Sequence, residues 1–268
     1  MPAQGVSLCY HLWIMRPDIV DLDQFYTTRL GQVSRRLIRR RLQEVWPDVT
    51  GQRLLGVGYA TPYLHVFRDK AERVLAAMPA SQGVIHWPKG ESGLVTLTEE
   101  VELPLPDSSI DRVLLVHALE NAERVRPTLR EIWRVMTSSG RLLVVVPNRR
   151  GVWARIERTP FGYGRPFSPP QLIRLLRETM FSPTTTSAAV SIPPVSWPPL
   201  LKMAPMMERV GLRWGRAFAG VLIVEAGKQI YAVSADRGYS IQRRRVVSPV
   251  ANNVSPRQVR CLNHRLGG

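Results

Sequence analysis

The sequence predicts an α/β domain with a mostly parallel sheet and helices on both faces. Short apolar segments alternate with helical patterns over residues 51–233, as in chains of βαβ units. The run 113–116, Val-Leu-Leu-Val, is apolar at every position, which is typical of a strand covered on both sides. A glycine turn at Gly56 and Gly58 follows the first apolar segment. In such sheets ligands bind beyond the carboxyl ends of the strands, so the turn marks a candidate ligand site.

Length and composition indicate a protein with one main α/β domain. With 268 residues, 44% of them hydrophobic, the chain has enough apolar material for one main domain. The two cysteines, Cys9 and Cys261, lie near opposite ends and form no zinc or disulfide pattern. No run approaches the roughly 18 residues of a membrane span, and residues 8–14 are too short for a secretory signal. We expect a cytoplasmic protein without a metal, with Met15 as an alternative start to Met1.

The net charge of +16 comes largely from arginine, concentrated at residues 35–41 and from residue 237 onward. Such a field attracts nucleic acid, acidic membrane surfaces and acidic proteins, and the charge alone does not choose among them. Residues 24–46 have apolar positions at helical spacing, with the arginines largely on the other faces. They predict an amphipathic helix ending at Pro47. Its arginines are either a solvated face or a contact for an anionic membrane surface or polyanion.

The remaining pattern predicts the elements of the domain. We expect strands at 51–57, 73–77, 83–86 or 94–97, 113–116, 142–146, 182–191 and 220–226. We expect helices at 62–69, 124–137, 169–179 and from 203, the second stopped by Ser139-Gly140. Residues 1–50 then form an N-terminal segment with the basic helix, 51–235 the domain, and 236–268 a basic tail. Because the tail lacks periodic apolar residues, we expect it to be disordered.

The glycine turn departs from the usual nucleotide-binding pattern. Ala60 and Pro62 stand where further glycines are expected. Proline is tolerated at the first position of a helix, with Thr61 as the N-cap before it. The same short string also suits an ordinary strand-to-helix turn.

Four segments in this order resemble a class I S-adenosylmethionine-dependent methyltransferase of type 11, the group that includes ubiquinone-biosynthesis enzymes. They are the glycine turn, LPLPDSSIDRV at 103–113, HALEN at 117–121 and LREIWRVMTSSGRLL at 129–143. The resemblance is strong over about 50–150 and weaker to about 233. It implies a Rossmann-like, seven-stranded, mostly parallel sheet with an antiparallel last strand. S-adenosylmethionine would lie across the carboxyl ends of the first strands.

The resemblance also implies which residues bind the cofactor. Glu99 matches the acid that meets the adenine amino group, and His117 and Ala118 match the segment that lines the cofactor and faces the acceptor. The full set is Gly56, Val57, Gly58, Tyr59, Ala60, Thr61, Glu99, Glu100, His117 and Ala118. Gly56 replaces an acid, and no carboxylate near 77–79 matches the one that binds the ribose hydroxyls. A hydrogen bond to a charged group contributes about 1.5–3 kcal/mol, so these departures predict weakened cofactor binding.

For methyl transfer the protein mainly has to position the acceptor in line with the methyl group, because the sulfonium already activates that group. If the acceptor must lose a proton, His117 is the candidate base; the alternative is a histidine that only packs at a strand end. Tyr163 and Arg165 belong to a lid over the acceptor or to a simple turn. Glu120 is interpreted as a carboxylate at a helix start rather than a catalytic acid.

Three functions remain open at this stage. The first is a methyltransferase acting on a small or lipophilic acceptor. The second is a non-catalytic methyltransferase-like scaffold, favoured by the altered turn and the missing ribose carboxylate. The third is a nucleic-acid methyltransferase guided by the arginine tail, against which Val146-Pro147-Asn148-Arg149 provides no amino-methylating Pro-Pro-aromatic motif. Cofactor titration separates the first two, and salt dependence of nucleic-acid binding tests the third.

Overall fold

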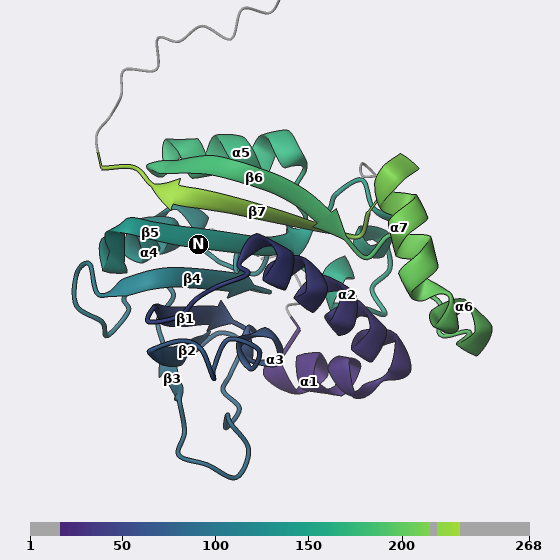
Figure 1. Cartoon of the computed structure of the whole chain (residues 1–268), viewed down its shortest axis with the longest axis horizontal. Helices are drawn as coiled ribbons and strands as arrows, with labels where there is room; N and C mark the ends of the chain where they lie inside the picture. The colour runs from purple at the N-terminus through teal and green to yellow at the C-terminus, as the bar shows by residue number, and fades with distance from the viewer. Residues whose placement is uncertain (1–16, 215–218, 231–268) are drawn as a thin grey trace, which may run out of the picture. The chain divides into compact units, whose positions relative to one another are not determined.

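The computed structural model describes residues 17–214 and 219–230, with the side chains of 212–214 left out. Its centre is a seven-stranded sheet in the order β3-β2-β1-β4-β5-β7-β6 (Figure 1). The strands are β1 (Arg53–Gly58), β2 (Arg73–Pro79), β3 (Val95–Thr98), β4 (Ile110–Val116), β5 (Met136–Pro147), β6 (Phe181–Ala189) and β7 (Val221–Lys228). The first five strands are parallel, and β7 runs antiparallel to both β5 and β6. The predicted fold class is confirmed.

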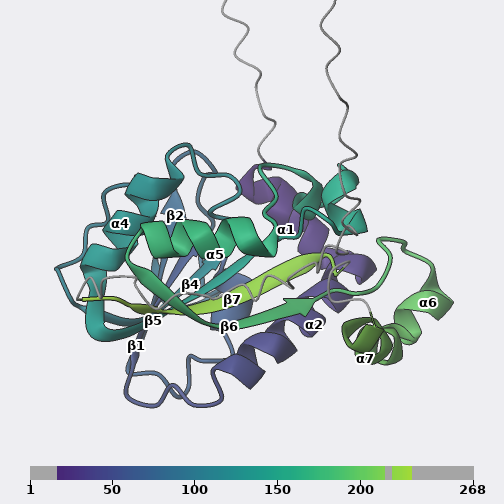
Figure 2. The same cartoon turned by 90° about the horizontal axis from the view of Figure 1, so that it is seen from above.

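Helices cover both faces of the sheet, as Figure 2 shows for α2 on one side and for α4 and α5 on the other. The helices are α1 (Ile19–Thr27), α2 (Arg29–Val45), α3 (Thr61–Leu64), α4 (Val125–Val135), α5 (Pro169–Glu178), α6 (Pro198–Lys202) and α7 (Ala204–Trp214), with short 3-10 turns η1 (Val152–Arg155) and η2 (Pro160–Gly162). Two buried clusters correspond to the two faces. One contains residues of α1, α2 and α3, and the other residues of α4 and α5.

The predicted helix at 24–46 is in fact two helices. Thr28 has an extended backbone and its Oγ1 accepts a hydrogen bond from Gly31 N at 3.0 Å, so it starts α2 one residue after α1 ends. A Cβ at Gly31 would lie 2.0 Å from the carbonyl oxygen of Phe25, which shows how closely the two helices meet. Periodicity missed the break because apolar spacing continues across it.

Two other predicted boundaries were wrong. The predicted helix at 62–69 spans only Thr61–Leu64. Ser139-Gly140 does not stop α4, because Met136 is already extended and begins β5, where it pairs with Ile110. Met136 is fully buried, so strand pairing and burial end the helix three residues before the glycine signal. The basic tail at 236–268 and the start at Met1 or Met15 lie outside the described residues.

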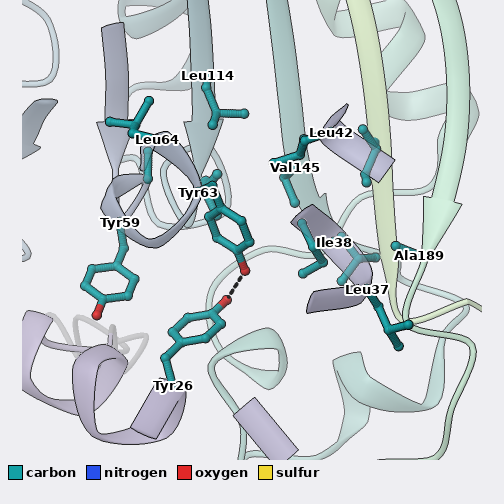
Figure 3. Packing of buried hydrophobic residues seen from close by; sticks show 14 of the residues in the cluster. Tyr26, Leu37, Ile38, Leu42, Tyr59, Tyr63, Leu64, Leu114, Val145 and Ala189 are labelled. Carbon is teal, nitrogen blue, oxygen red and sulfur yellow. Dashed lines mark hydrogen bonds between the residues drawn. The ribbon is translucent and has the colours of Figure 1, made fainter. Parts of the chain in front are cut away.

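The N-terminal helices belong to the main core. Leu37, Ile38 and Leu42 of α2 pack in the same cluster as Val145 of β5 and Ala189 of β6 (Figure 3). Burying a large aliphatic side chain stabilises the fold by about 1.5–3 kcal/mol. The helix face that carries these residues therefore contributes substantially to the stability of the sheet domain.

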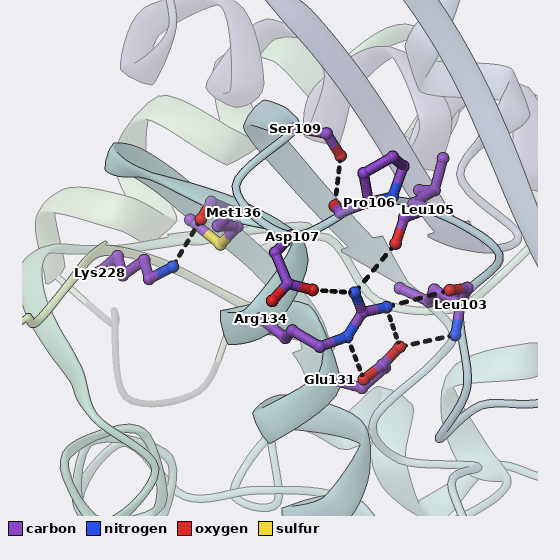
Figure 4. A network of polar contacts seen from close by, with 9 residues as sticks. All are labelled: Leu103, Leu105, Pro106, Asp107, Ser109, Glu131, Arg134, Met136 and Lys228. Carbon is purple, nitrogen blue, oxygen red and sulfur yellow. Dashed lines mark hydrogen bonds and ion pairs between the residues drawn. The ribbon is translucent and has the colours of Figure 1, made fainter.

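The connection between β3 and β4 is held by one arginine of α4. Arg134 forms ion pairs with Glu131 and Asp107 and donates hydrogen bonds to the carbonyl oxygens of Leu103 and Leu105, at 3.1 and 3.0 Å (Figure 4). The Arg134 hydrogen bond lowers the pKa of the Glu131 carboxyl. Two of the segments that carry the family resemblance thus meet in a structural network, away from the carboxyl ends of the strands.

Candidate cofactor and acceptor site

The glycine turn is shaped by the neighbouring strand β4. Gly58 has a φ of 78°, a region that favours glycine. A Cβ at this position would lie 2.4 Å from the carbonyl oxygen of Val116 and 2.9 Å from Cβ of Ala118. At Gly56, the same atom would lie 2.6 Å from Cδ1 of Leu64. Both glycines are therefore required by close contacts within the protein itself.

The turn leads directly into the short helix α3. The carbonyl oxygen of Ala60 accepts hydrogen bonds from Tyr63 N at 2.9 Å and Leu64 N at 3.1 Å. Ala60 is thus the N-cap residue, and Thr61 is already the first helical residue, with no side-chain cap. The prediction of Thr61 as N-cap was wrong, because the backbone of Ala60 is already helical and its carbonyl oxygen accepts the first helical hydrogen bonds. Val57, Tyr59, Ala60 and Thr61 are all buried.

Three tyrosines, Tyr26, Tyr59 and Tyr63, close this region and are called the tyrosine cluster below. The Tyr63 hydroxyl donates to the Tyr26 oxygen at 2.9 Å (Figure 3). The ring of Tyr26 stacks on that of Tyr59 at 5.6 Å, and the Tyr59 hydroxyl donates to Oδ1 of Asp23 at 2.9 Å. Burial raises the pKa of each of the three phenols, so all remain protonated hydrogen-bond donors. Sequence patterns gave no signal for Tyr26 or Tyr63 as site residues.

His117 lies at the end of β4, in contact with this cluster. It has a φ of 51° and is 1% exposed. Its Nε2 lies 2.9 Å from the Tyr26 hydroxyl and its Nδ1 lies 3.1 Å from Oε1 of Glu120. Because the Tyr26 oxygen accepts a hydrogen bond from the Tyr63 hydroxyl, Tyr26 directs its own hydroxyl hydrogen to Nε2, which leaves the imidazole hydrogen on Nδ1 facing Glu120. The structure thus buries the imidazole between a tyrosine hydroxyl and a carboxylate, and a general base likewise needs an oriented imidazole.

Glu120 has a different environment from the one predicted. It is 2% exposed and lies five residues before α4 begins at Val125. Its interpretation as a carboxylate at a helix start was therefore wrong. The segment after β4 makes a separate turn, in which Asn121 N bonds to the carbonyl oxygen of Ala118 at 3.1 Å, and this turn directs Glu120 inward.

Three buried oxygens around His117 have no hydrogen-bond donor among the described residues: Gln82 Oε1, Glu120 Oε2 and Asn121 Oδ1. The amide nitrogens of both Gln82 and Asn121 donate to the carbonyl oxygen of His117, so the three acceptors surround one strand end. Buried acceptors normally have partners. A ligand carrying a positive charge, an ammonium group and hydroxyl donors would satisfy them, and S-adenosylmethionine has all three. In chemical terms the residues present fit that cofactor.

The space beside these acceptors is closed by the protein's own side chains. Gln82 is 2% exposed and Tyr26 is 3% exposed, and both reach His117. The start of α1 holds Gln82 in place, because Ile19 N donates to the Gln82 carbonyl oxygen at 2.9 Å. Entry of a ligand next to Gly58 and Ala118 therefore requires α1 and Gln82 to move.

Glu99 and Glu100 lie at a separate, open part of the same strand edge. They line a small cavity of about 210 Å³ together with Ala80 and Ser81, which follow β2. Oε1 of Glu100 accepts from the Ser81 hydroxyl at 3.0 Å, and its Oε2 accepts from Glu123 N at 3.2 Å. The structure thus brings the segments after β2 and β3 together at this cavity, and the side chain there that follows β2 is a serine rather than a carboxylate.

Comparison with known proteins relates part of the chain to methyltransferases. Residues 52–144 match the family model described as a methyltransferase domain. A 130-residue stretch is 29% identical to the demethylmenaquinone methyltransferase of Corynebacterium efficiens, and covers 48% of this chain and 56% of that protein. The chain thus spans about half the length of the curated relative that it matches.

Solved structures agree on the fold. An S-adenosylmethionine-dependent methyltransferase of Thermotoga maritima superposes with a TM-score of 0.57 at 15% identity, covering 79% of this chain and 96% of that one. The [4+2]-cyclase SpnF superposes with a TM-score of 0.52 at 23% identity, covering 75% and 83%. The fold is that of the class I methyltransferases.

Two features are absent from the part of the chain that the structure describes. Within 17–214 and 219–230, no helix has the length and hydropathy needed to cross a membrane. Over the same residues, no group of three or more histidine, cysteine, aspartate or glutamate side chains is placed to hold a metal ion.

Proposed function

We propose that this protein is an S-adenosylmethionine-dependent methyltransferase acting on a small or lipophilic acceptor. The observation that carries this function is the His117–Glu120 pair, surrounded by three buried acceptor oxygens at the end of β4. This end lies beside β1, where the strand order reverses, the position at which open α/β sheets bind ligands. Of the residues expected from the sequence to bind the cofactor, Gly58 ends β1, and His117 and Ala118 follow β4.

The cofactor, when bound, supplies a methyl group activated by a sulfonium. Gln82, Glu120 and Asn121 would accept hydrogen bonds from its donor groups. Nε2 of His117 takes the proton from an acceptor hydroxyl or amine once the Tyr26 hydroxyl has moved away from it. Glu120 holds the Nδ1 proton and stabilises the imidazolium that results. The apolar side chains around Phe161, whose ring lies 5.0 Å from that of His117, exclude water from this step.

A second candidate function is supported by the closed space beside Gly58. In this alternative, the protein is a methyltransferase-like scaffold in which Tyr26 and Gln82 permanently take the place of a ligand. The missing ribose carboxylate also supports it, and the same fold in the [4+2]-cyclase SpnF illustrates that the sheet alone does not define the reaction.

Isothermal titration with S-adenosylmethionine separates the two candidates. If the protein is an enzyme, we expect S-adenosylmethionine to bind in the micromolar range. We expect tighter binding by Tyr26→Ala, because this change removes a side chain that closes the site. Glu120→Gln should weaken binding about tenfold, the effect of losing one charged hydrogen bond. Exchange of an exposed carboxylate, Glu157→Gln, provides the matched control and should leave binding unchanged. No binding at millimolar cofactor in the native protein and in Tyr26→Ala would establish the scaffold.

We also propose that exposed arginines of α2 add a weak attraction for anionic membranes or nucleic acid. Arg36 and Arg40 are exposed on this helix, and the chain carries a net charge of +16. Such an attraction falls steeply with added salt. Binding to anionic vesicles or RNA that persists at high salt would contradict it.

A further inference from the structure

A large cavity lies on the other side of the segment that contains His117 and Glu120. Its volume is about 800 Å³, within the range of small-molecule sites. It is lined by the residues that begin α4, by the segments after β5 and before α5, and by one face of α5. Four of its lining side chains are arginines: Arg124, Arg126, Arg149 and Arg165.

The positive charge of this cavity is poorly compensated. Arg126 forms an ion pair with Glu178, and Glu123 is the one acidic residue among those that line the cavity. The side chains of Arg124, Arg149 and Arg165 make no ion pair or hydrogen bond with any other described residue. Guanidinium groups that outnumber the carboxylates lining one cavity favour binding of a carboxylate or phosphate, to which each can donate two hydrogen bonds.

The walls between the arginines are apolar. Val125, Phe167 and Leu175 line the cavity together with prolines. An aromatic or aliphatic body would gain free energy by covering these side chains. Inorganic anions lack such a body, so the cavity favours an organic acid over a bare ion.

The backbone of this cavity is fixed to the candidate base. Arg165 N donates to the carbonyl oxygen of Glu120 at 2.8 Å. Gly164 has a φ of 72°, and a Cβ there would lie 2.5 Å from the same carbonyl oxygen and 2.7 Å from Oδ1 of Asn121. The loop that carries Arg165 is therefore in direct backbone contact with the segment that carries Glu120.

We propose that this arginine cavity binds a small organic acid, with its carboxylate or phosphate between Arg124, Arg149 and Arg165 and its apolar body against Phe167. Its role as the site that recognises the methyl acceptor rests on the proposed function. Binding of the organic acid does not rest on the proposed function, because all the side chains that would contact the acid line the cavity itself.

The test uses 2-naphthoate as the probe in isothermal titration without cofactor, with the neutral 2-naphthalenemethanol and inorganic phosphate as comparisons. We expect 2-naphthoate to bind, and Arg149→Gln and Arg165→Gln each to weaken binding by about tenfold. Arg155→Gln and Arg158→Gln change exposed arginines of the neighbouring loop that do not line the cavity, and should leave binding unchanged. Thermal unfolding of each variant establishes that it is folded.

Each outcome decides one part of the proposal. Equal binding of the neutral probe, an equal loss in the Arg155 and Arg158 variants, or no binding of 2-naphthoate would overturn it. Phosphate that binds as tightly as 2-naphthoate would overturn the organic acid as ligand. If the arginine dependence holds in a protein that does not bind S-adenosylmethionine, the site stands and the methyltransferase function fails. If S-adenosylmethionine binds and 2-naphthoate does not, the methyltransferase function stands and the arginine cavity fails as an organic-acid site.

Discussion

The hydroxyl of Tyr26 lies 2.9 Å from Nε2 of His117, although 91 residues separate them in the sequence. Tyr26 belongs to α1, before the segment that matches the methyltransferase family, and His117 lies inside that segment. The candidate base is therefore contacted by a helix that the family model does not include. Any conformational change that frees Nε2 of His117 must therefore move Tyr26 of α1.

The first prediction concerns this contact. Tyr26→Phe keeps the ring but removes the hydroxyl, which leaves Nε2 of His117 and the Tyr63 hydroxyl without a buried partner. We expect the free energy of unfolding to fall by about 1–3 kcal/mol, measured by urea denaturation. Tyr163→Phe is the control, because no described residue hydrogen-bonds its hydroxyl, and it should change stability little. Equal effects of the two changes would show that the Tyr26 contact adds nothing.

The second prediction separates backbone strain from steric contact in the glycine turn. Gly58 and Gly90 both have a φ of 78°, so alanine at either position carries a similar strain of about 1–2 kcal/mol. A Cβ at Gly90 meets no atom within 4 Å, whereas at Gly58 it would lie 2.4 Å from a backbone oxygen. Gly58→Ala should therefore lower the melting temperature clearly more than Gly90→Ala. Similar melting temperatures would mean that the turn relaxes around the new methyl group.

The third prediction concerns Arg134. Arg134→Lys keeps the charge but loses the planar guanidinium, which serves two carboxylates and two carbonyl oxygens at once. A lysine ammonium cannot reproduce this geometry, so we expect a loss of about 1–3 kcal/mol in unfolding free energy. Arg130→Lys, at an exposed position of the same helix, should be close to neutral. A lysine variant as stable as the native protein would contradict the role given to the network.

The fourth prediction is a pH dependence. Hydrogen bonds from Arg53 lower the pKa of the Asp111 carboxyl, with Arg53 Nε at 2.9 Å from Oδ2. A lowered folded-state pKa means that the pair stabilises the protein above the unfolded pKa of about 3.9, and that this contribution disappears as the pH falls through the folded-state value. Because Arg53 is partly exposed, we expect about 1 kcal/mol at neutral pH. Asp111→Asn should therefore differ from the native protein at pH 7 and converge with it near pH 2; a difference that persists there would exclude this cause.

Much of the fold was predictable because its strands carry a local signal. The apolar runs at 113–116 and 142–146 are strands, and the helix expected at 169–179 spans Pro169–Glu178. Of the boundaries that failed, one depends on a local helix cap and another on a long-range strand pairing. Thr28 separates α1 from α2 through a cap, and Met136 leaves α4 because it pairs with Ile110. Neither interaction has a counterpart in local spacing.

The candidate site was predictable only in part. The turn at Gly56 and Gly58 and the segment at His117 have sequence patterns, so the sequence alone predicts a site at this strand edge. The closing side chains Tyr26 and Gln82 have no such pattern, because the partner that each contacts lies 91 and 35 residues away. Glu120 was assigned to a helix start because an acid before a helical pattern usually caps it, whereas the intervening turn buries this one.

The packing of α2 against the sheet has a practical consequence for making the protein. An expression fragment cut to the family match at 52–144 would leave out Leu37, Ile38 and Leu42, and would uncover the apolar face of the sheet that they protect. Large uncovered apolar surfaces promote aggregation, so such a fragment is expected in inclusion bodies. A fragment that starts at or before residue 17 and extends through β7 keeps that face covered, and is the one to purify for ligand screening.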